Sequence, residues 1–256
     1  MSNTFYAPGE QRAAKVNDLF AAIARRYDLL NDLQSFGLHR LWKRRVVQLA
    51  GVRPGDLALD LCCGTGDIAF ALARQGAETT GLDFSEKMLA VAEARRRKSE
   101  VRSQKPDFGS PAAGFRLPTF RQGDALQIPF PDNSFDIVTV GYGLRNLTSW
   151  EKGLEEMHRL AKAGGRIVVL DFGKPPNALW RKIYFTHLKC SAPLMGWLFC
   201  GNAQAYAYIL ESLKNYPAQL AVANKMCDLK LANIRVINLL GGAMAINYGE
   251  KPAGSF

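Results

Sequence analysis

The stretch Leu57-Ala58-Leu59-Asp60-Leu61-Cys62-Cys63-Gly64-Thr65-Gly66-Asp67 carries the first indication of the fold class. Its apolar run ends in a glycine turn, and residues 68–74 then show helical periodicity. Residues 78–82 predict a second strand, after which Ser85 as N-cap starts a helix that runs to about Lys98. Strand, helix, strand, helix at this pitch is typical of a parallel sheet covered on both faces.

The flanking sequence extends this pattern in both directions. Upstream, the apolar spacing predicts helices, and downstream it predicts further strands with one helix between the last two. Later helices and a closing hairpin follow, and the hairpin requires at least one strand to run against the others. The expected helices cover 12–34, 41–49, 150–161, 178–190, 203–215 and 218–230, and the expected strands lie at Phe120, 136–141, 166–172, 234–240 and 243–248.

We expect a single domain over residues 1–256. Residues 1–50 form an N-terminal helical cap, and residues 51–172 form the core that binds a ligand at its glycine turn. Within the core, residues 99–118 are rich in Ser, Gly, Pro and Lys and predict an exposed loop insert. Residues 173–256 form a helical elaboration on the substrate side and the C-terminal hairpin.

Composition excludes several classes of protein. The 48% hydrophobic and 22% charged residues are those of a globular chain, and the longest mostly apolar stretch, 192–200, falls short of the ~20 residues of a membrane span. No apolar signal core follows Met1, so we expect a chain that is neither secreted nor integral to a membrane. The five Cys residues include no CxxC, so we expect reduced thiols.

The net charge of the chain is +10, but it is unevenly distributed. Residues 51–93 hold seven acidic and three basic residues, and this local negative charge disfavours a phosphate at the glycine turn.

Acidic residues at successive strand ends point to a particular cofactor. Asp67 starts the helix where a pyrophosphate would otherwise lie, and its charge repels phosphate. Asp83 ends the second strand and is placed to accept from both hydroxyls of a ribose, and Asp124 ends the third and could accept from an adenine amine. An adenosine with a positive centre and no phosphate fits these acids, and S-adenosylmethionine (SAM) is that cofactor.

Other functions fit the residues less well. Gly64-x-Gly66-x-x-Ala69 is a loose match to a dinucleotide fingerprint, but Asp67 opposes it. A nucleic-acid methyltransferase would use the basic surface, yet the chain lacks the Pro-Cys and the Asn/Asp-Pro-Pro-aromatic motifs of such enzymes. The His residues show no ligand spacing, so no metal site is expected.

Several long strings resemble the ubiquinone/menaquinone biosynthesis C-methyltransferases (UbiE/MenG type). The resemblance implies a class I SAM-dependent methyltransferase: an α/β fold with a seven-stranded, mostly parallel Rossmann-like sheet, an antiparallel final strand and helices on both faces. It also implies methyl transfer to a ring carbon of a prenylated quinol. The strings are Tyr27-Asp28-Leu29-Leu30-Asn31-Asp32, residues 35–44 (SFGLHRLWKR), residues 63–67 (CGTGD), residues 129–136 (PFPDNSFD) and Gly143-Leu144-Arg145-Asn146.

By this resemblance the cofactor would contact Gly64, Thr65, Gly66, Asp83, Phe84, Asp124, Ala125 and Gly141. The sequence departs from its relatives at some of these positions. Cys62 replaces the first glycine of the general motif, Gly141 stands where relatives often have Ser, and the insert lengthens the link from Asp83 to Asp124.

The resemblance also places the chemistry. Arg145 would stabilise the oxygen of an ionised quinol, because its fixed cation lowers the pKa of the substrate hydroxyl although it is a poor base itself. A water would then carry the proton away. Asn146 and Tyr27 would orient the same oxygen. The alternatives are a structural ion pair for Arg145 and a core position for Tyr27.

The expected reaction is the SAM-dependent conversion of demethylmenaquinol to menaquinol. The same chemistry on demethylphylloquinone or a ubiquinone-pathway benzoquinol, and a non-catalytic assembly subunit, stay open as alternatives. We expect a cytoplasmic protein that is peripheral at the inner face of an anionic membrane, without nucleic acid, and a homodimer or a quinone-biosynthesis complex stays open. Two interpretations stay open for Leu194, Met195, Trp197, Leu198 and Phe199: a core position, or an opening for the lipid tail near basic Lys182 and Lys189.

Overall fold

The computed structural model describes residues 11–103, 116–200, 210–213 and 215–253. Its centre is a seven-stranded sheet in the order β3-β2-β1-β4-β5-β7-β6, in which β7 runs opposite to the other six strands. The strands are β1 (Leu57–Leu61), β2 (Glu78–Asp83), β3 (Thr119–Gln122), β4 (Phe135–Gly141), β5 (Ala161–Phe172), β6 (Ala232–Leu239) and β7 (Met244–Glu250). This confirms the class I methyltransferase fold and the predicted C-terminal hairpin.

Alternating side chains of the central strands pack into two layers, one on each face of the sheet. Val138 and Val140 of β4 pack with α6 (Trp150–Leu160) and α9 (Gln219–Asp228), and Ile137 packs on the opposite face with α3 (Leu38–Ala50) and α4 (Asp67–Arg74). Because successive side chains of a strand point to opposite faces, both layers are apolar and the central strands are buried. The central strands are thereby held rigidly, and their carboxyl ends can position a site.

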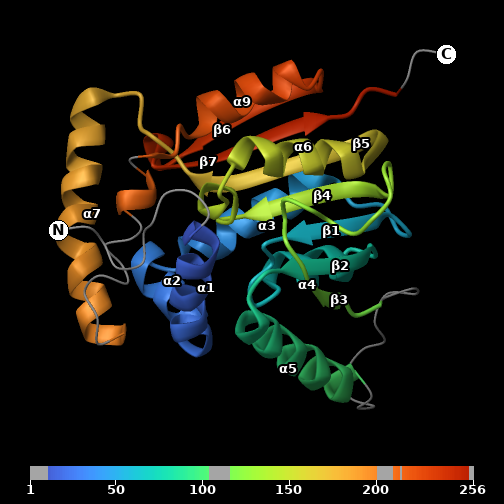
Figure 1. Cartoon of the computed structure of the whole chain (residues 1–256), viewed down its shortest axis with the longest axis horizontal. Coiled ribbons are helices and arrows are strands. Elements are labelled where there is room, and N and C mark those ends of the chain that lie inside the picture. The colour runs from blue at the N-terminus through green and yellow to red at the C-terminus, as the bar shows by residue number, and fades with distance from the viewer. Residues whose placement is uncertain (1–10, 104–115, 201–209, 214, 254–256) are drawn as a thin grey trace.

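A helical cap lies beyond those carboxyl ends. Figure 1 shows the arrowheads of β1 and β4 pointing toward α1 (Gln11–Ile23) and α2 (Tyr27–Ser35), with α7 (Ala178–Cys200) standing on the same side of the molecule. Part of the cap and of α7 forms a third apolar cluster, which includes Ile23, Leu30, Tyr184 and Leu188. The cap and the C-terminal elaboration therefore meet beyond the carboxyl ends of the central strands.

The cap departs from the single helix predicted over residues 12–34. A 3-10 turn, η1 (Ala24–Arg26), separates α1 from α2, because α1 packs against α5 (Glu86–Ser103) whereas α2 packs against α3. Two consecutive residues with positive φ, Phe36 at 50° and Gly37 at 76°, then reverse the chain between α2 and α3. Tertiary packing thus overrides a continuous helical periodicity.

Other boundaries also differ from the prediction. Helix α5 continues to Ser103, so residues 99–103 of the predicted loop insert are helical, because no Gly or Pro interrupts them. The rest of the insert up to residue 115 lies outside the described residues. Helix α7 is longer than the predicted 178–190, and of the predicted helix 203–215 only residues 210–213 and 215 are described, all as helical. Among the described residues, no helix is long and apolar enough to cross a membrane.

Candidate active site

The turn after β1 has a backbone that favours glycine at several positions. Cys62, Gly64 and Gly66 have φ values of 50°, 56° and 87°. A side chain at Gly66 would bring its Cβ within 2.8 Å of the Phe120 ring. Cys62 holds a left-handed conformation that favours glycine, at a cost of about 1–2 kcal/mol. The side chain that departs from the general motif therefore stands at a position whose backbone suits glycine.

Asp83 at the end of β2 is tied to this turn. Its Oδ2 accepts a hydrogen bond from the Gly64 N–H at 2.8 Å, and its Oδ1 accepts from the Ser85 N–H at 2.8 Å. Burial raises the pKa of the Asp83 carboxyl, and the backbone N–H groups that it accepts from partly offset that rise. The carboxylate is thus held in one orientation at the carboxyl ends of β1 and β2.

A cavity of about 110 Å³ opens over these groups. It brings together six of the predicted cofactor residues: Gly64, Asp83, Phe84, Asp124, Ala125 and Gly141. Thr65 and Gly66 do not line it. The Thr65 hydroxyl donates instead to Asp28 Oδ1 of α2 at 2.8 Å, and Gly66 packs between the rings of Phe70 and Phe120.

Ser85 is a residue of this cavity that sequence reasoning missed as a ligand contact. We predicted it to be the N-cap of α5, but its Oγ is buried and has no hydrogen-bond partner in the described structure. A buried hydroxyl without a partner costs about 1–3 kcal/mol, so a polar ligand is expected to pair with it. Together with the Asp83 carboxylate and the glycine turn, this orphaned group fits an adenosine-type cofactor such as SAM.

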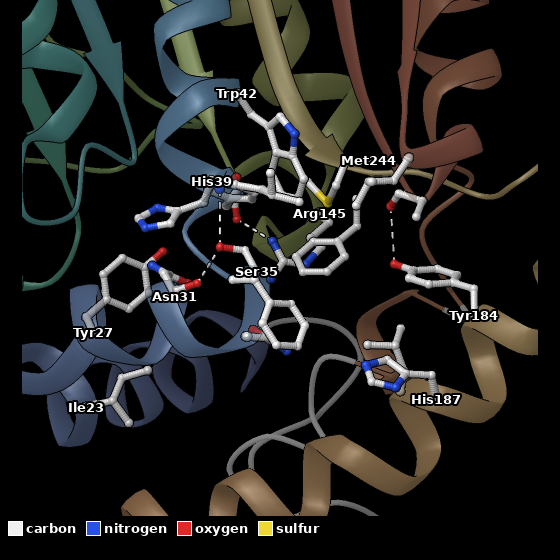
Figure 2. A pocket seen from close by; sticks show the side chains of 18 of the residues that line it. Ile23, Tyr27, Asn31, Ser35, His39, Trp42, Arg145, Tyr184, His187 and Met244 are labelled. Carbon is white, nitrogen blue, oxygen red and sulfur yellow. Dashed lines mark hydrogen bonds between the residues drawn. The ribbon is translucent and has the colours of Figure 1, made fainter.

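A second, larger cavity of about 420 Å³ lies between the cap, α7 and the turn before β7. Its walls are mainly apolar, and Figure 2 shows Tyr27, Asn31 and His39 on one side and Tyr184, His187 and Met244 on the other. Phe20, Tyr27 and Tyr142 line both cavities, so the two cavities are adjacent. The site can hold a polar ligand beside an apolar one.

Arg145 lies at the inner end of the larger cavity and is only 5% exposed. Its Nη1 lies 3.1 Å from Asp171 Oδ1 at the end of β5, and it also donates to the Tyr142 carbonyl. Its guanidinium stacks over Phe172, 4.6 Å from the ring centre. Burial raises the pKa of Asp171, and Arg145 opposes that rise. Arg145 therefore forms the ion pair that was predicted as the structural alternative. It also lines the cavity, where its cation could contact a substrate oxygen.

The other predicted catalytic residues occupy different places. Asn146 lines the cofactor cavity and not the larger one, and its Nδ2 donates to the Tyr142 carbonyl at 3.0 Å. Tyr27 lies at the boundary of both cavities, and burial raises the pKa of its phenol, so it is a neutral donor near pH 7. Tyr27 is therefore better placed than Asn146 to contact an apolar substrate.

Asp67 lines neither the cofactor cavity nor the apolar cavity beside it. Its carboxylate pairs with Lys43 of α3 at 2.7 Å and with Arg95 of α5 at 2.7 Å. Burial alone would raise its pKa, but these cations hold the pKa of Asp67 well below its usual range. Asp67 therefore binds the cap to the core at the helix start where a phosphate would otherwise lie.

Two further predictions have a limited outcome. The predicted tail opening around Leu194 and Phe199 concerns side chains outside the described residues. Within the described part of the chain, no group of three or more His, Cys, Asp or Glu side chains could hold a metal ion.

Comparisons with known proteins agree with this geometry. The model of the ubiE/COQ5 methyltransferase family matches residues 9–251. A demethylmenaquinone methyltransferase from Desulfitobacterium hafniense is 42% identical over 248 residues, covering 95% of this chain and 92% of that protein. The ubiquinone/menaquinone biosynthesis C-methyltransferase UbiE of Azotobacter vinelandii is 39% identical, with coverage of 96% and 93%.

Solved structures resemble the fold at low sequence identity. A SAM-dependent methyltransferase from Thermotoga maritima has a TM-score of 0.61 at 17% identity, covering 91% of this chain and 99% of that one. A SAM-dependent methyltransferase from Aquifex aeolicus has a TM-score of 0.54 at 17% identity, covering 82% and 89%. With the family model spanning nearly all of the sequence, the chain belongs to the ubiE/COQ5 methyltransferase family.

Proposed function

We propose that this protein transfers a methyl group from SAM to a ring carbon of a prenylated naphthoquinol, converting demethylmenaquinol to menaquinol. The observation that supports it best is the pairing of the two cavities across Tyr27 and Tyr142. Methyl transfer needs donor and acceptor carbons held in line, which adjacent cavities sharing a wall can provide. The relatives named demethylmenaquinone methyltransferase and UbiE support the same substrate class.

The cofactor would be held by the glycine turn, Asp83, Ser85 and Asp124, and when bound it supplies an electrophilic methyl group. The chain's own residues then have to bind and ionise the quinol. Apolar residues of the larger cavity would hold the ring and the first part of the prenyl chain. Arg145 would stabilise the developing oxyanion, because its orientation is already set by Asp171 and little reorganisation is needed.

Product analysis tests this function. The protein is incubated with methyl-labelled SAM and a panel of reduced quinones, and products are identified by mass spectrometry. We expect label in the ring of demethylmenaquinol, above that in demethylphylloquinol and in a ubiquinone-pathway benzoquinol. A benzoquinol product as the main one would reassign the substrate. No labelled quinone, with SAM bound, would favour the alternative of a non-catalytic assembly subunit.

Arg145 has its own test. Arg145→Ala should abolish methylation while SAM affinity changes little. Because this substitution leaves Asp171 buried without its cation, Arg145→Lys is measured beside it as the variant that keeps the charge. Lys cannot form the same fork, so we expect turnover to fall by about 10²-fold. Parallel loss of turnover and of SAM affinity in both variants would make Arg145 purely structural.

We further propose that the mouth of the larger cavity docks on an anionic membrane, which would place the protein at the inner face of the cytoplasmic membrane. Phe36 is 89% exposed, and Leu240 and Ile183 are about half exposed, although all three line the cavity. Arg40 and Lys182 are exposed and lie close in sequence to Phe36 and Ile183 respectively. An apolar rim with surrounding cations favours contact with anionic lipid, from which a lipid substrate could enter.

Vesicle flotation tests the docking surface. Wild-type protein should float with phosphatidylglycerol vesicles and less with phosphatidylcholine vesicles. Phe36→Ser with Leu240→Ser should lower flotation, whereas Leu220→Ser should not, because Leu220 is 69% exposed but lies on α9. Equal flotation of all variants would contradict this surface.

A further inference from the structure

Given the proposed function, the quinol hydroxyl must lose its proton, and the water expected to carry it away needs a side chain that can accept it. Arg145 cannot take this proton near neutral pH, because its guanidinium remains charged below pH ~12. Among the described residues that line the larger cavity there is no Asp or Glu. The tyrosines of the cavity stay protonated, since burial raises the pKa of Tyr27, Tyr142 and Tyr184. The imidazoles of His39 and His187 are the remaining acceptors.

These two imidazoles differ in their surroundings. His187 on α7 is exposed, whereas His39 on α3 is only 3% exposed. The Nε2 of His39 lies 2.8 Å from Asp32 Oδ1 on α2. Its Nδ1 is buried and has no hydrogen-bond partner in the described structure, although the residue lines the cavity. His39 thus combines a carboxylate partner on one ring nitrogen with an unused ring nitrogen on the other.

Asp32 sets the tautomer of this imidazole. Arg40 holds the Asp32 carboxylate with hydrogen bonds of 2.8 and 2.6 Å, and the contacts from Arg40 and His39 lower the pKa of Asp32 to about 2. An ionised carboxylate can only accept, so Nε2 of His39 carries the hydrogen and Nδ1 carries a lone pair. His39 and Tyr27 both line the larger cavity, and Figure 2 shows them on the same side of it.

Burial above all leaves His39 neutral at rest. Burial lowers the pKa of His39, and Lys43 lowers it further, whereas Asp32 and Asp67 oppose that fall. Arg40 shares the charge of Asp32 and so weakens its pull on the proton. A neutral imidazole with a free lone pair is the form that a general base requires.

We propose that His39 is the general base of the methyl transfer and that Asp32 is its positioning residue. The quinol O–H bond breaks, its proton moves to Nδ1 of His39, and its electron pair stays on the oxygen beside Arg145. That charge spreads to the ring carbon, which forms a bond to the methyl carbon while sulfur keeps the electron pair of the breaking methyl–sulfur bond. The ring carbon then loses its hydrogen as a proton and the oxygen regains one, so that a single net proton leaves through His39 to solvent.

Substitution of His39 tests this role. His39→Gln keeps a side-chain N–H for Asp32 and removes the basic nitrogen. We expect kcat to fall by about 10²-fold or more, with the quinol KM within about threefold of wild type. Calorimetry should show unchanged SAM affinity, which verifies that the variant folds. His158→Gln, on α6 and outside both cavities, is the control and should retain wild-type turnover.

The pH profile separates a base from a packing residue. Wild-type kcat should fall on the acid side as His39 becomes protonated, and His39→Gln should lose that limb. The defect of His39→Gln should shrink near pH ~10, where a phenol-like hydroxyl ionises without a base. Asp32→Asn replaces a carboxylate, which only accepts hydrogen bonds, with an amide, which can also donate one to the imidazole. We expect this variant to lower kcat and to shift the acid limb of the pH profile. Asp32→Glu, which keeps the carboxylate, should partly restore both.

The outcomes distinguish this proposal from the proposed function. Wild-type protein that methylates no reduced quinone contradicts the function itself. If the wild-type protein is active and His39→Gln keeps kcat within threefold and the same acid limb, the proposal that His39 is the general base is wrong. The proposed function is unaffected by that result.

Discussion

Nζ of Lys43 on α3 donates to Oδ2 of Asp67 at the start of α4 across 2.7 Å. The contact joins the N-terminal cap to the first turn after the cofactor loop. Arg95 of α5 completes the junction, since its Nη1 also donates to the Thr65 carbonyl at 2.8 Å. Residues from the cap, the loop and α5 are therefore held by one network of charges.

We expect Lys43→Met to lower the free energy of unfolding by about 2 kcal/mol at pH 7, because a largely buried carboxylate loses one of its cations. The folded-state pKa of Asp67 is depressed, so this stabilisation is present above the unfolded pKa of about 3.9 and is lost as pH falls below it. Urea unfolding of both proteins from pH 7 to pH 3 measures the difference. Arg45→Met, on the exposed side of α3, is the control and should change stability little.

Ser85→Ala should weaken SAM binding by about 3–10-fold without lowering stability, because its buried hydroxyl has no partner in the described structure. Ser149 offers the opposite case. Its Oγ accepts from the Lys152 N–H at 3.2 Å as the N-cap of α6, so Ser149→Ala should cost about 1 kcal/mol and leave SAM affinity unchanged. Calorimetry and thermal unfolding of both variants check this, and equal SAM affinity of Ser85→Ala and wild type would contradict it.

Asp60→Asn should change how stability depends on pH. Burial raises the pKa of Asp60 to about 7, although the Thr139 hydroxyl at 2.7 Å and the Ala69 N–H at 3.1 Å favour its ionised form. The folded protein then keeps a proton that the unfolded chain releases near pH ~4, so stability should fall between about pH 4 and pH 7. Asp60→Asn should flatten this fall in denaturant titrations, and an unchanged slope would count against it.

Gly143 and Cys62 should behave as a coupled pair. A Cβ at Gly143 would lie 2.3 Å from the Cβ and 2.8 Å from the Sγ of Cys62. We expect Gly143→Ala to destabilise the protein by about 1–3 kcal/mol through overpacking. Cys62→Gly removes both contacting atoms, so the double variant should recover most of that loss. A double-mutant cycle by urea unfolding measures the coupling, and additive effects would contradict it.

Much of the fold was predictable because its signals are local. The apolar strand before Asp60, the glycine turn after it and the closing hairpin each follow from short-range periodicity and turn chemistry. The acids at strand ends were predictable for a similar reason, since the carboxyl ends of parallel strands meet at one edge of the sheet. Asp83 and Asp124 accordingly line the same cavity.

The site was less predictable where its contacts depend on the direction of the chain in space. Asp32 and His39 lie on different helices, and they meet because left-handed residues at Phe36 and Gly37 reverse the chain between them. Arg145 and Asp171 are far apart in sequence, and their pairing depends on the neighbouring positions of β4 and β5. The periodicity of the sequence predicts neither the contact of Asp32 with His39 nor that of Arg145 with Asp171.

From sequence alone come the order of strands and helices, the glycine turn, the acidic strand ends and the resemblance to a quinone-methyltransferase family, because these depend on residues that are close along the chain. The tertiary structure adds the division of the site into a cofactor cavity and an apolar cavity, and the pairing of Arg145 with Asp171. It also shows that the Ser85 hydroxyl and the His39 Nδ1 have no partner among the described residues. A side chain's hydrogen-bond partner and its burial are properties of packed neighbours, and only the folded chain brings those neighbours together.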